Sequence, residues 1–302
     1  MVLVRGPRAV IIVCGGGHGA LGFSGGITMW NGQDVDLGAY FARIGYDGDA
    51  SPTLQTLREL HRAHVAAIPF ENLDVALGRT VPLEVKSLVG KLVGQARGGY
   101  CYEQNSLFAA VLERLGFEFG GRGARNRTRG TWLPPVTHAL LAVTVEGQLW
   151  LCDTGFGGQG PLEPVPLRDG AVVEQGGWTF GVGIEDDGTH VLRSLRPGGW
   201  LDLYAFAPQT LYPADFTVMN HYSSSHPQSR FVGQVVAQRT APGVRRALVR
   251  DELTTVRTDG TEERIRVPAD ELGGVLSEVF DIVMEREELA QLGALGGGLH
   301  GR

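Results

Sequence analysis

Apolar residues in the first third of the chain recur every three or four positions, the spacing of one face of a helix. Gly45 and Gly116 end two of these runs, and Ser51 and Pro52 are expected to be the cap and first residue of another. Helices are predicted over 37–44, 52–65 and 85–93, and from near residue 101 to 115. Residues 36–117 are therefore expected to form a helical domain.

The period then changes to that of strands. Residues 138–145 form a β-type run, Glu146 and Gly147 a two-residue turn, and residues 148–152 the return strand. Short strands predicted up to residue 206 indicate a small antiparallel barrel or sheet. Further strands are predicted over 231–237, 246–250 and 252–258, and helices over 270–283 and 285–295.

The first 28 residues need a separate interpretation. Residues 17–22 match the glycine pattern of dinucleotide-binding turns, but no helix opens there and no second strand–helix unit follows. We therefore expect a poorly ordered extension rather than a nucleotide site. Residues 296–302 are expected to be frayed, and residues 220–227 to form a polar loop suited to binding.

Composition narrows the class of protein. The 302 residues carry a formal net charge of −6, which argues against a nucleic-acid partner. Three cysteines cannot form a disulfide framework, which fits a reducing, cytoplasmic location. No cysteine or histidine spacing suggests zinc ligands, so no metal is expected. The apolar runs are too short to predict a membrane span.

Cys101 is the candidate nucleophile. It follows Gly98 and Gly99 and lies at or just before the first turn of a predicted helix, where free N–H groups and the helix dipole favour a thiolate. The two glycines are expected to permit positive φ and to leave room for a substrate. A lone cysteine is more often a buried structural residue, so this interpretation depends on finding a base nearby.

The predicted hairpin supplies that base and its orienting carboxylate. With a two-residue loop, Val145 faces Gln148, and Asp153 lies diagonally opposite His138 on the same face of the sheet. A three-residue loop would place the two side chains on opposite faces. Cys152 has the opposite facing to Asp153 and is interpreted as a core residue.

Three segments carry a resemblance to a known family: RGGYCYEQN around Cys101, THALLAV with His138, and LCDTGFGG with Asp153. Together with IPFENLD and NHYSSSHPQSRF, they resemble the arylamine N-acetyltransferase family over 36–292. The resemblance implies an α+β fold with a helical bundle, a central antiparallel β-barrel, an α/β lid and a papain-like Cys-His-Asp core. The corresponding ranges are 34–118, 119–220 and 221–302, and the family has no counterpart of the extension 1–33.

The resemblance also implies a mechanism: ping-pong acetyl transfer from acetyl-CoA to an arylamine, arylhydrazine or arylhydroxylamine through an acetyl-cysteine. Acetyl-CoA would be a co-substrate, with no permanently bound cofactor. Cys101, His138 and Asp153 would be the triad, and the backbone N–H of Tyr102 an oxyanion donor. Phe70 and Phe156 would line the acceptor pocket. The residues implied near CoA are Gly155, Gly157, Tyr222, Ser225 and His226.

Three alternatives remain open from the sequence. An amide synthase of the same fold would close a macrolactam from a carrier-bound acyl chain. A cysteine hydrolase or transglutaminase-like enzyme would use water or a lysine as the acceptor, and a non-enzymatic binding module would keep the fold alone. Neither the preferred amine nor the oligomeric state follows from the sequence.

Overall fold

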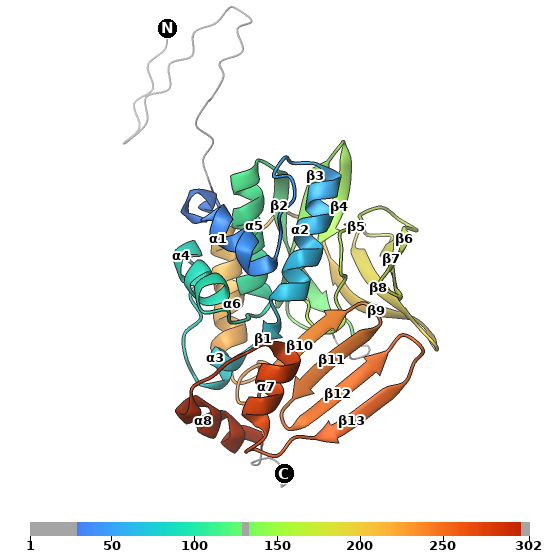
Figure 1. Cartoon of the computed structure of the whole chain (residues 1–302). Coiled ribbons are helices and arrows are strands. Elements are labelled where there is room, and N and C mark those ends of the chain that lie inside the picture. Colours follow the sequence, from blue (N-terminus) through green and yellow to red (C-terminus); the bar gives the residue numbers. More distant parts are fainter. Residues whose placement is uncertain (1–28, 129–132, 297–302) are drawn as a thin grey trace, which may run out of the picture.

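The computed structural model describes residues 29–128 and 133–296, shown in colour in Figure 1. The dinucleotide-like segment and most of the predicted extension lie outside these residues. The described part is an α+β fold with a helical bundle, an eight-stranded antiparallel sheet curved into a nearly closed barrel, and a lid of a second sheet with helices. The predicted fold class is confirmed.

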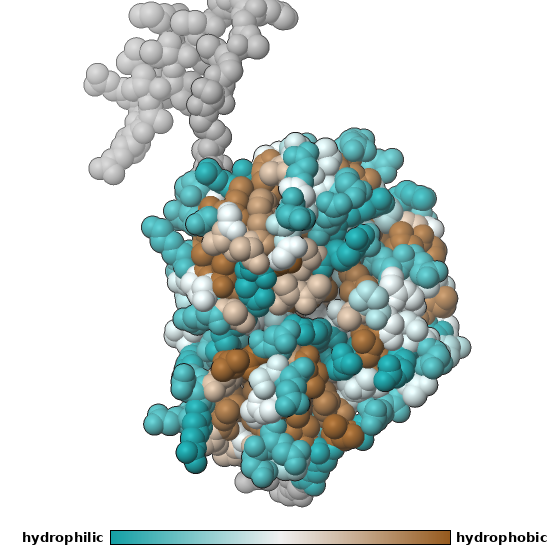
Figure 2. Space-filling view, viewed as in Figure 1, coloured by the Kyte–Doolittle hydropathy of each residue, from teal (hydrophilic) through white to brown (hydrophobic). Residues whose placement is uncertain are grey.

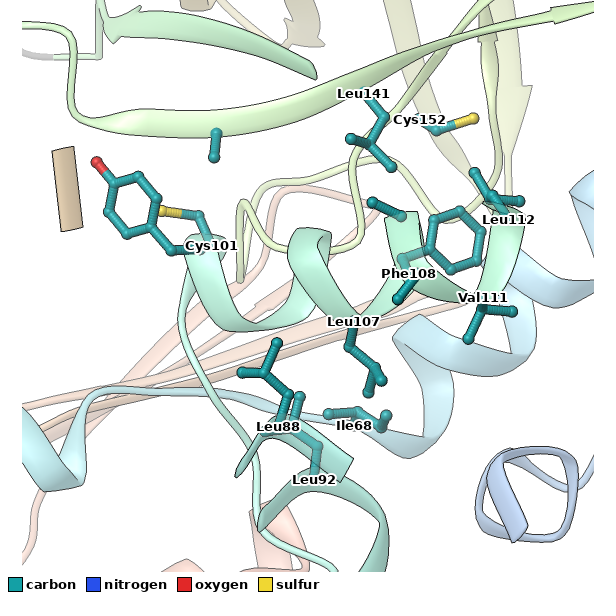
Figure 3. Packing of buried hydrophobic residues seen from close by; sticks show 14 of the residues in the cluster. Ile68, Leu88, Leu92, Cys101, Leu107, Phe108, Val111, Leu112, Leu141 and Cys152 are labelled. Atoms are coloured by element: carbon teal, nitrogen blue, oxygen red, sulfur yellow. The ribbon is translucent and has the colours of Figure 1, made fainter. Parts of the chain in front are cut away.

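Helix α5 is the centre of the bundle, and every residue from Cys101 to Leu112 is buried. Figure 3 shows Leu107 facing Ile68 and Leu92 on one side of α5. Phe108 points instead toward the strands that carry Leu141 and Cys152. The helices of this part are α1 (Leu37–Ile44), α2 (Leu54–Ala67), α3 (Leu73–Ala76), α4 (Val85–Leu88) and α5 (Cys101–Leu115), with a 3₁₀ turn over Gly32–Asp34 and a π-helical segment over Val89–Gly94.

The predicted start of α2 is wrong by two residues. Thr53 is the cap, and its Oγ1 accepts a hydrogen bond from the N–H of Thr56 at 3.2 Å. Ser51 instead donates to Asp49 in the preceding turn, so its side chain is not available as a cap. The helix predicted over 85–93 exists, but its second half has π geometry.

The barrel sheet has the strand order β5-β4-β3-β2-β9-β8-β7-β6. All neighbouring strands are antiparallel, and all strands predicted up to residue 206 are present. Strand β2 was not predicted, because three of its nine residues are arginine or glutamate and none of its first three is buried. The strands are β2 (Glu118–Asn126), β3 (His138–Val145), β4 (Gln148–Cys152), β5 (Val165–Pro166), β6 (Val172–Gln175), β7 (Trp178–Ile184), β8 (His190–Arg196) and β9 (Gly199–Phe206).

The lid sheet has the order β1-β10-β11-β12-β13, so its first strand comes from the helical part of the chain. Figure 1 shows α7 lying against this sheet beside β10, with α8 at its end. Leu276, Phe280 and Leu292 are fully buried between these helices and the sheet. The elements are β1 (Phe70–Glu71), β10 (Val236–Ala241), β11 (Val244–Val249), β12 (Glu252–Arg257), β13 (Glu262–Arg266), α7 (Leu272–Phe280) and α8 (Arg286–Gly296).

Two predictions between barrel and lid are wrong. Most of the expected polar loop 220–227 is the last part of α6 (Pro213–Ser225), whose buried residues Phe216, Asn220 and Ser223 are mostly polar and give no apolar stripe. The strand predicted over 231–237 begins only at Val236. Asn72 holds the preceding segment in turns, because its Nδ2 donates to the carbonyls of residues 231 and 234.

The predicted extension to residue 33 is too long. Both carboxylate oxygens of Glu113 accept hydrogen bonds from this segment, from Trp30 N at 3.1 Å and Gly32 N at 2.8 Å. The Trp30 ring is buried, with its centroid 5.9 Å from that of Phe119 and 5.3 Å from that of Phe216. The folded body therefore includes residues 29–33.

The surface of the described part is mixed. Figure 2 shows hydrophilic and hydrophobic residues interspersed on one face, with hydrophobic residues gathered in the lower part, where Figure 1 places α7 and the β10–β13 sheet. Across residues 29–128 and 133–296, every helix is too short or too polar to cross a membrane.

Candidate active site

The loop before Cys101 is fixed by a buried ion pair and by close packing. Arg97 donates from Nη2 to Glu71 Oε1 at 2.7 Å. A Cβ on Gly98 would lie 2.3 Å from Pro69 O, and one on Gly99 would lie 2.9 Å from Glu103 Cβ. Neither glycine has a positive φ, so that expectation is wrong. Both residues are glycine because neighbouring protein atoms occupy the space, and not because a substrate does.

Cys101 is the first residue of α5, as predicted. Tyr100 precedes it as the N-cap, and its N–H donates to Glu103 Oε2 at 3.0 Å. In Figure 3 the Cys101 sulfur lies at the N-terminal end of α5 and points away from the buried side chains of Leu107 and Phe108. The residue is 3 % exposed, so its thiol can be reached only through a narrow cleft.

The hairpin that carries the other two residues has the predicted turn. Glu146 and Gly147 have φ values of 54° and 74°, as a two-residue type I′ turn requires. Val145 pairs with Gln148, so the register is the one that places His138 and Asp153 on one face. His138 Nε2 lies 2.7 Å from Asp153 Oδ2. The thiol of Cys101 also interacts with the His138 ring.

Asp153 is held from three further directions that sequence reasoning missed. Its Oδ1 accepts hydrogen bonds from Asn105 Nδ2 at 3.2 Å and from Gly155 N at 3.0 Å. Its own N–H donates to His61 Nε2 at 3.0 Å. Since Nε2 of His61 accepts, its Nδ1 carries the proton and donates to the carbonyl of Leu162 at 3.0 Å. These hydrogen bonds fix both the side chain and the backbone of Asp153.

His138 and Asp153 each stabilise the charged form of the other. Burial alone would lower the pKa of His138, but the charge and hydrogen bond of Asp153 and the neighbouring Cys101 raise it to about 10. Burial would raise the pKa of Asp153, yet His138, with the nearby Tyr204 and Asn105, lowers it overall. The geometry thus favours an imidazolium–carboxylate pair at neutral pH.

The cleft at the thiol is small and partly aromatic, with a volume of about 90 Å³. Phe70 and Phe156 both line it, as the sequence suggested, beside Cys101 and His138. The Phe156 ring meets the His138 ring edge-on, with centroids 5.0 Å apart. Phe231, which was not predicted, closes the same cleft against Phe70.

The five residues expected to contact CoA do not all line the same space. Gly155 lines the cleft, but its missing side chain is explained by Cys101, whose Cα would be 2.6 Å from a Cβ there. Gly157 has a φ of 83°, and a Cβ would fall 2.2 Å from Gln238 Oε1. Both glycines are therefore accounted for by contacts inside the protein.

Tyr222 lies in an adjoining pocket of about 160 Å³ that shares Thr137 and Phe231 with the cleft. Ser225 and His226 belong to the same end of α6 but line neither space. His226 instead stacks on Tyr222, with ring centroids 4.5 Å apart, and Ser225 Oγ donates to the carbonyl of residue 221 at 2.6 Å.

The described residues give no support for a reactive Cys152 or for a metal site. Cys152 is fully buried in the core, as expected. In the part of the chain that the structure describes, no group of three or more His, Cys, Asp or Glu side chains could hold a metal ion. A thiol at a helix start, an imidazole and a carboxylate in this order are the groups that thiol-dependent enzymes use to transfer or hydrolyse acyl groups.

Comparison with known proteins narrows this class. A model of the N-acetyltransferase family matches residues 53–289. An arylamine N-acetyltransferase of Mycobacterium bovis is 39 % identical over 271 residues, covering 86 % of this chain and 93 % of the relative. The chain belongs to the arylamine N-acetyltransferase family, which consists of acetyl-transferring enzymes.

Solved structures agree with this assignment. An arylamine N-acetyltransferase of Nocardia farcinica superposes with a TM-score of 0.83 at 42 % identity, covering 87 % of this chain and 95 % of that chain. The Mycobacterium marinum enzyme in complex with CoA superposes with a TM-score of 0.81 at 35 % identity, covering 86 % and 99 %.

Proposed function

We propose that this chain transfers the acetyl group of acetyl-CoA to the nitrogen of an arylamine or arylhydrazine, or to the oxygen of an arylhydroxylamine, in two half-reactions through an acetyl thioester on Cys101. The observation that carries the proposal is the His138–Asp153 pair at 2.7 Å beside a thiol at the start of α5. The CoA complex of the M. marinum relative supports CoA as the co-substrate.

In the first half-reaction the Cys101 thiolate, paired with the His138 imidazolium, attacks the carbonyl carbon of acetyl-CoA. The new S–C bond forms as the bond to the CoA sulfur breaks, and His138 gives its proton to the leaving thiolate. The backbone N–H of Tyr102 stabilises the oxyanion in this step, which its position in the first turn of α5 supports.

In the second half-reaction the amine nitrogen attacks the acetyl carbon of the thioester. Neutral His138 takes the proton of the amine, the Cys101 thiolate leaves, and the imidazolium–thiolate pair is restored. The flat acceptor ring fits between Phe70 and Phe156, whose side chains line the cleft. The pocket at Tyr222 adjoins the cleft and offers a route for the pantetheine chain.

The test uses intact mass after incubation with acetyl-CoA alone. The wild-type chain is expected to become heavier by one acetyl group, and addition of an arylamine or arylhydrazine should remove it. Cys101→Ala should show no gain, whereas Cys152→Ala, which removes a buried core thiol, should still be acetylated. Acetylation of Cys101→Ala would refute the proposal, and loss of the acetyl group to water at a rate that arylamines do not change would indicate a hydrolase.

A further inference from the structure

The search for a further site leads to Arg245 in β11, far from the thiol. Its side chain is 4 % exposed, and within residues 29–128 and 133–296 none of its three guanidinium nitrogens has a hydrogen-bond partner. The guanidinium instead lies over the Trp178 ring, 3.8 Å from its centroid. Buried charges in proteins are normally paired, because removing an unpaired ion from water is costly. Arg245 is therefore positioned for a partner that the chain does not supply.

Arg245 lines a groove of about 840 Å³ between the barrel strands β7–β9 and the lid strands β11–β13, which lie side by side in Figure 1. The charged residues of the groove are Arg196, Arg245, Arg246, Arg257, Arg264 and Glu262. Arg246 and Arg257 lie on the opposite face of the lid sheet from Arg245, so three arginines, Arg196, Arg245 and Arg264, share the groove with Glu262. This excess of positive charge occurs in a chain whose formal net charge is −6. Glu262 is already paired with Arg264. The concentration of positive charge in one groove favours an anionic ligand.

The arrangement at Arg245 fits a phosphate better than a carboxylate. Arg196 lies near enough for its charge, after burial, to help lower the pKa of Arg245 to about 9, so the two guanidinium groups share one region. Arg264 of β13 borders the same groove and lies on the same face of the lid sheet as Arg245. Several guanidinium groups around one space match the multiple charges and acceptor oxygens of a phosphate group.

We propose that Arg245, with Arg196 and Arg264, forms a binding site for a phosphate-bearing anion in this groove. Gln159 and Gln238 line both the groove and the catalytic cleft, so the two spaces adjoin. The phosphate group has two sources: the acetyl-CoA co-substrate, an assignment that rests on the proposed function, or a separate phosphorylated molecule. The site itself follows from the groove and does not depend on that choice.

The test is isothermal titration calorimetry of the full chain with pyrophosphate at low ionic strength. Arg196→Gln, at a half-buried position, should weaken binding at least tenfold, and Arg245→Gln should do the same if it folds. Arg266→Gln is the matched control, because Arg266 is an exposed arginine of the same sheet that does not line the groove. Its affinity for pyrophosphate should equal that of the wild type. No binding to the wild type at millimolar pyrophosphate, or equal affinity in Arg196→Gln and Arg266→Gln, would overturn the proposal.

A second titration, with CoA present at saturation, identifies the source. If the phosphates of CoA occupy the groove, CoA abolishes pyrophosphate binding, and Arg196→Gln weakens CoA binding as well. If the ligand is a separate molecule, the affinity for pyrophosphate is the same with and without CoA. Both measurements are equilibrium binding, so they give an answer even if acetyl transfer is not observed.

Discussion

At the scale of single residues, the position of Asp153 depends on groups that perform no chemistry. One carboxylate oxygen, Oδ2, is hydrogen-bonded to His138, and the other, Oδ1, accepts hydrogen bonds from Asn105 and Gly155. The backbone of Asp153 is fixed separately, by its hydrogen bond to His61. His61 lines neither the cleft nor the adjoining pocket, and we propose that it is a positioning residue for the carboxylate.

We predict that His61→Leu lowers kcat by about tenfold to a hundredfold, because small displacements of a catalytic group are that costly. The KM values should change little, since His61 lines neither the cleft nor the adjoining pocket. The variant also leaves the buried N–H of Asp153 without an acceptor, which should cost about 1–3 kcal/mol of stability. Steady-state kinetics and urea denaturation measure the two effects.

His61→Gln serves as the control, because its side-chain oxygen can accept the same hydrogen bond. It should recover part of kcat. If both variants lose stability equally while kcat stays at the wild-type value, His61 is structural only.

At the scale of elements, the site forms where the start of α5 meets the end of the β3–β4 hairpin. Gly155 is the contact point, since a Cβ there would lie 2.6 Å from Cys101 Cα and 2.8 Å from Asn105 Nδ2. Backbone at that distance cannot give way without separating the two elements. The separation of thiol and imidazole is therefore set by a residue with no side chain.

We predict that Gly155→Ala lowers kcat/KM at least tenfold and also lowers the melting temperature, because the hairpin must shift away from α5. Gly274→Ala in α7 is the control, because nothing lies within 4 Å of a Cβ there. Alanine at this open helical position should raise stability by about 0.5–1 kcal/mol and leave activity unchanged. Wild-type activity in Gly155→Ala would show that the contact does not set the catalytic distance.

At the scale of the whole molecule, residues 29–33 are part of the folded body. The family match begins only at residue 53, yet Trp30 and Gly32 are bound to Glu113. We predict that a chain starting at Met29 keeps its activity and melting temperature. A chain starting at Asp34 should be less stable by about 2–3 kcal/mol, mainly through loss of the buried Trp30 side chain. Thermal melts of the two truncated chains measure how much residues 29–33 contribute to stability. Nicotinamide-dinucleotide binding that disappears with residues 1–28 would instead restore the dinucleotide interpretation.

Stability should also depend on pH through two buried histidines. Burial lowers the pKa of His61 to about 4 and that of His64 to about 3, so both stay neutral in the folded chain while the unfolded chain takes up protons near pH 6.5. Their contribution to stability is complete above pH 6.5 and is lost as the pH falls toward 4. For His61 alone this amounts to about 3 kcal/mol. His138 has a raised pKa, so its contribution is complete below pH 6.5 and is lost toward pH 10.

We predict that His64→Gln, which can still accept the hydrogen bond of Tyr40, loses less stability between pH 7.5 and pH 4.5 than the wild type. Urea denaturation across this range measures the difference. His221→Gln removes an exposed histidine and should follow the wild-type profile. Identical profiles for all three chains would show that His64 does not remain neutral in the folded state.

The sequence by itself determined the local features. Helical spacing and Gly45 set the bounds of α1, and Glu146 and Gly147 fixed the turn. Because a two-residue turn sets strand register and side chains alternate with a period of two, the facing of His138 and Asp153 followed without any distant contact.

Only the tertiary structure decided the rest. His61, Asn105 and Tyr204 lie 48 to 92 residues from Asp153 in the sequence. No local pattern brings them together. The same holds for Arg245, whose groove exists only because barrel and lid pack side by side. A buried polar residue in a strand or helix looks like any other until its partner is placed, because hydrogen bonds between distant segments leave no period in the sequence.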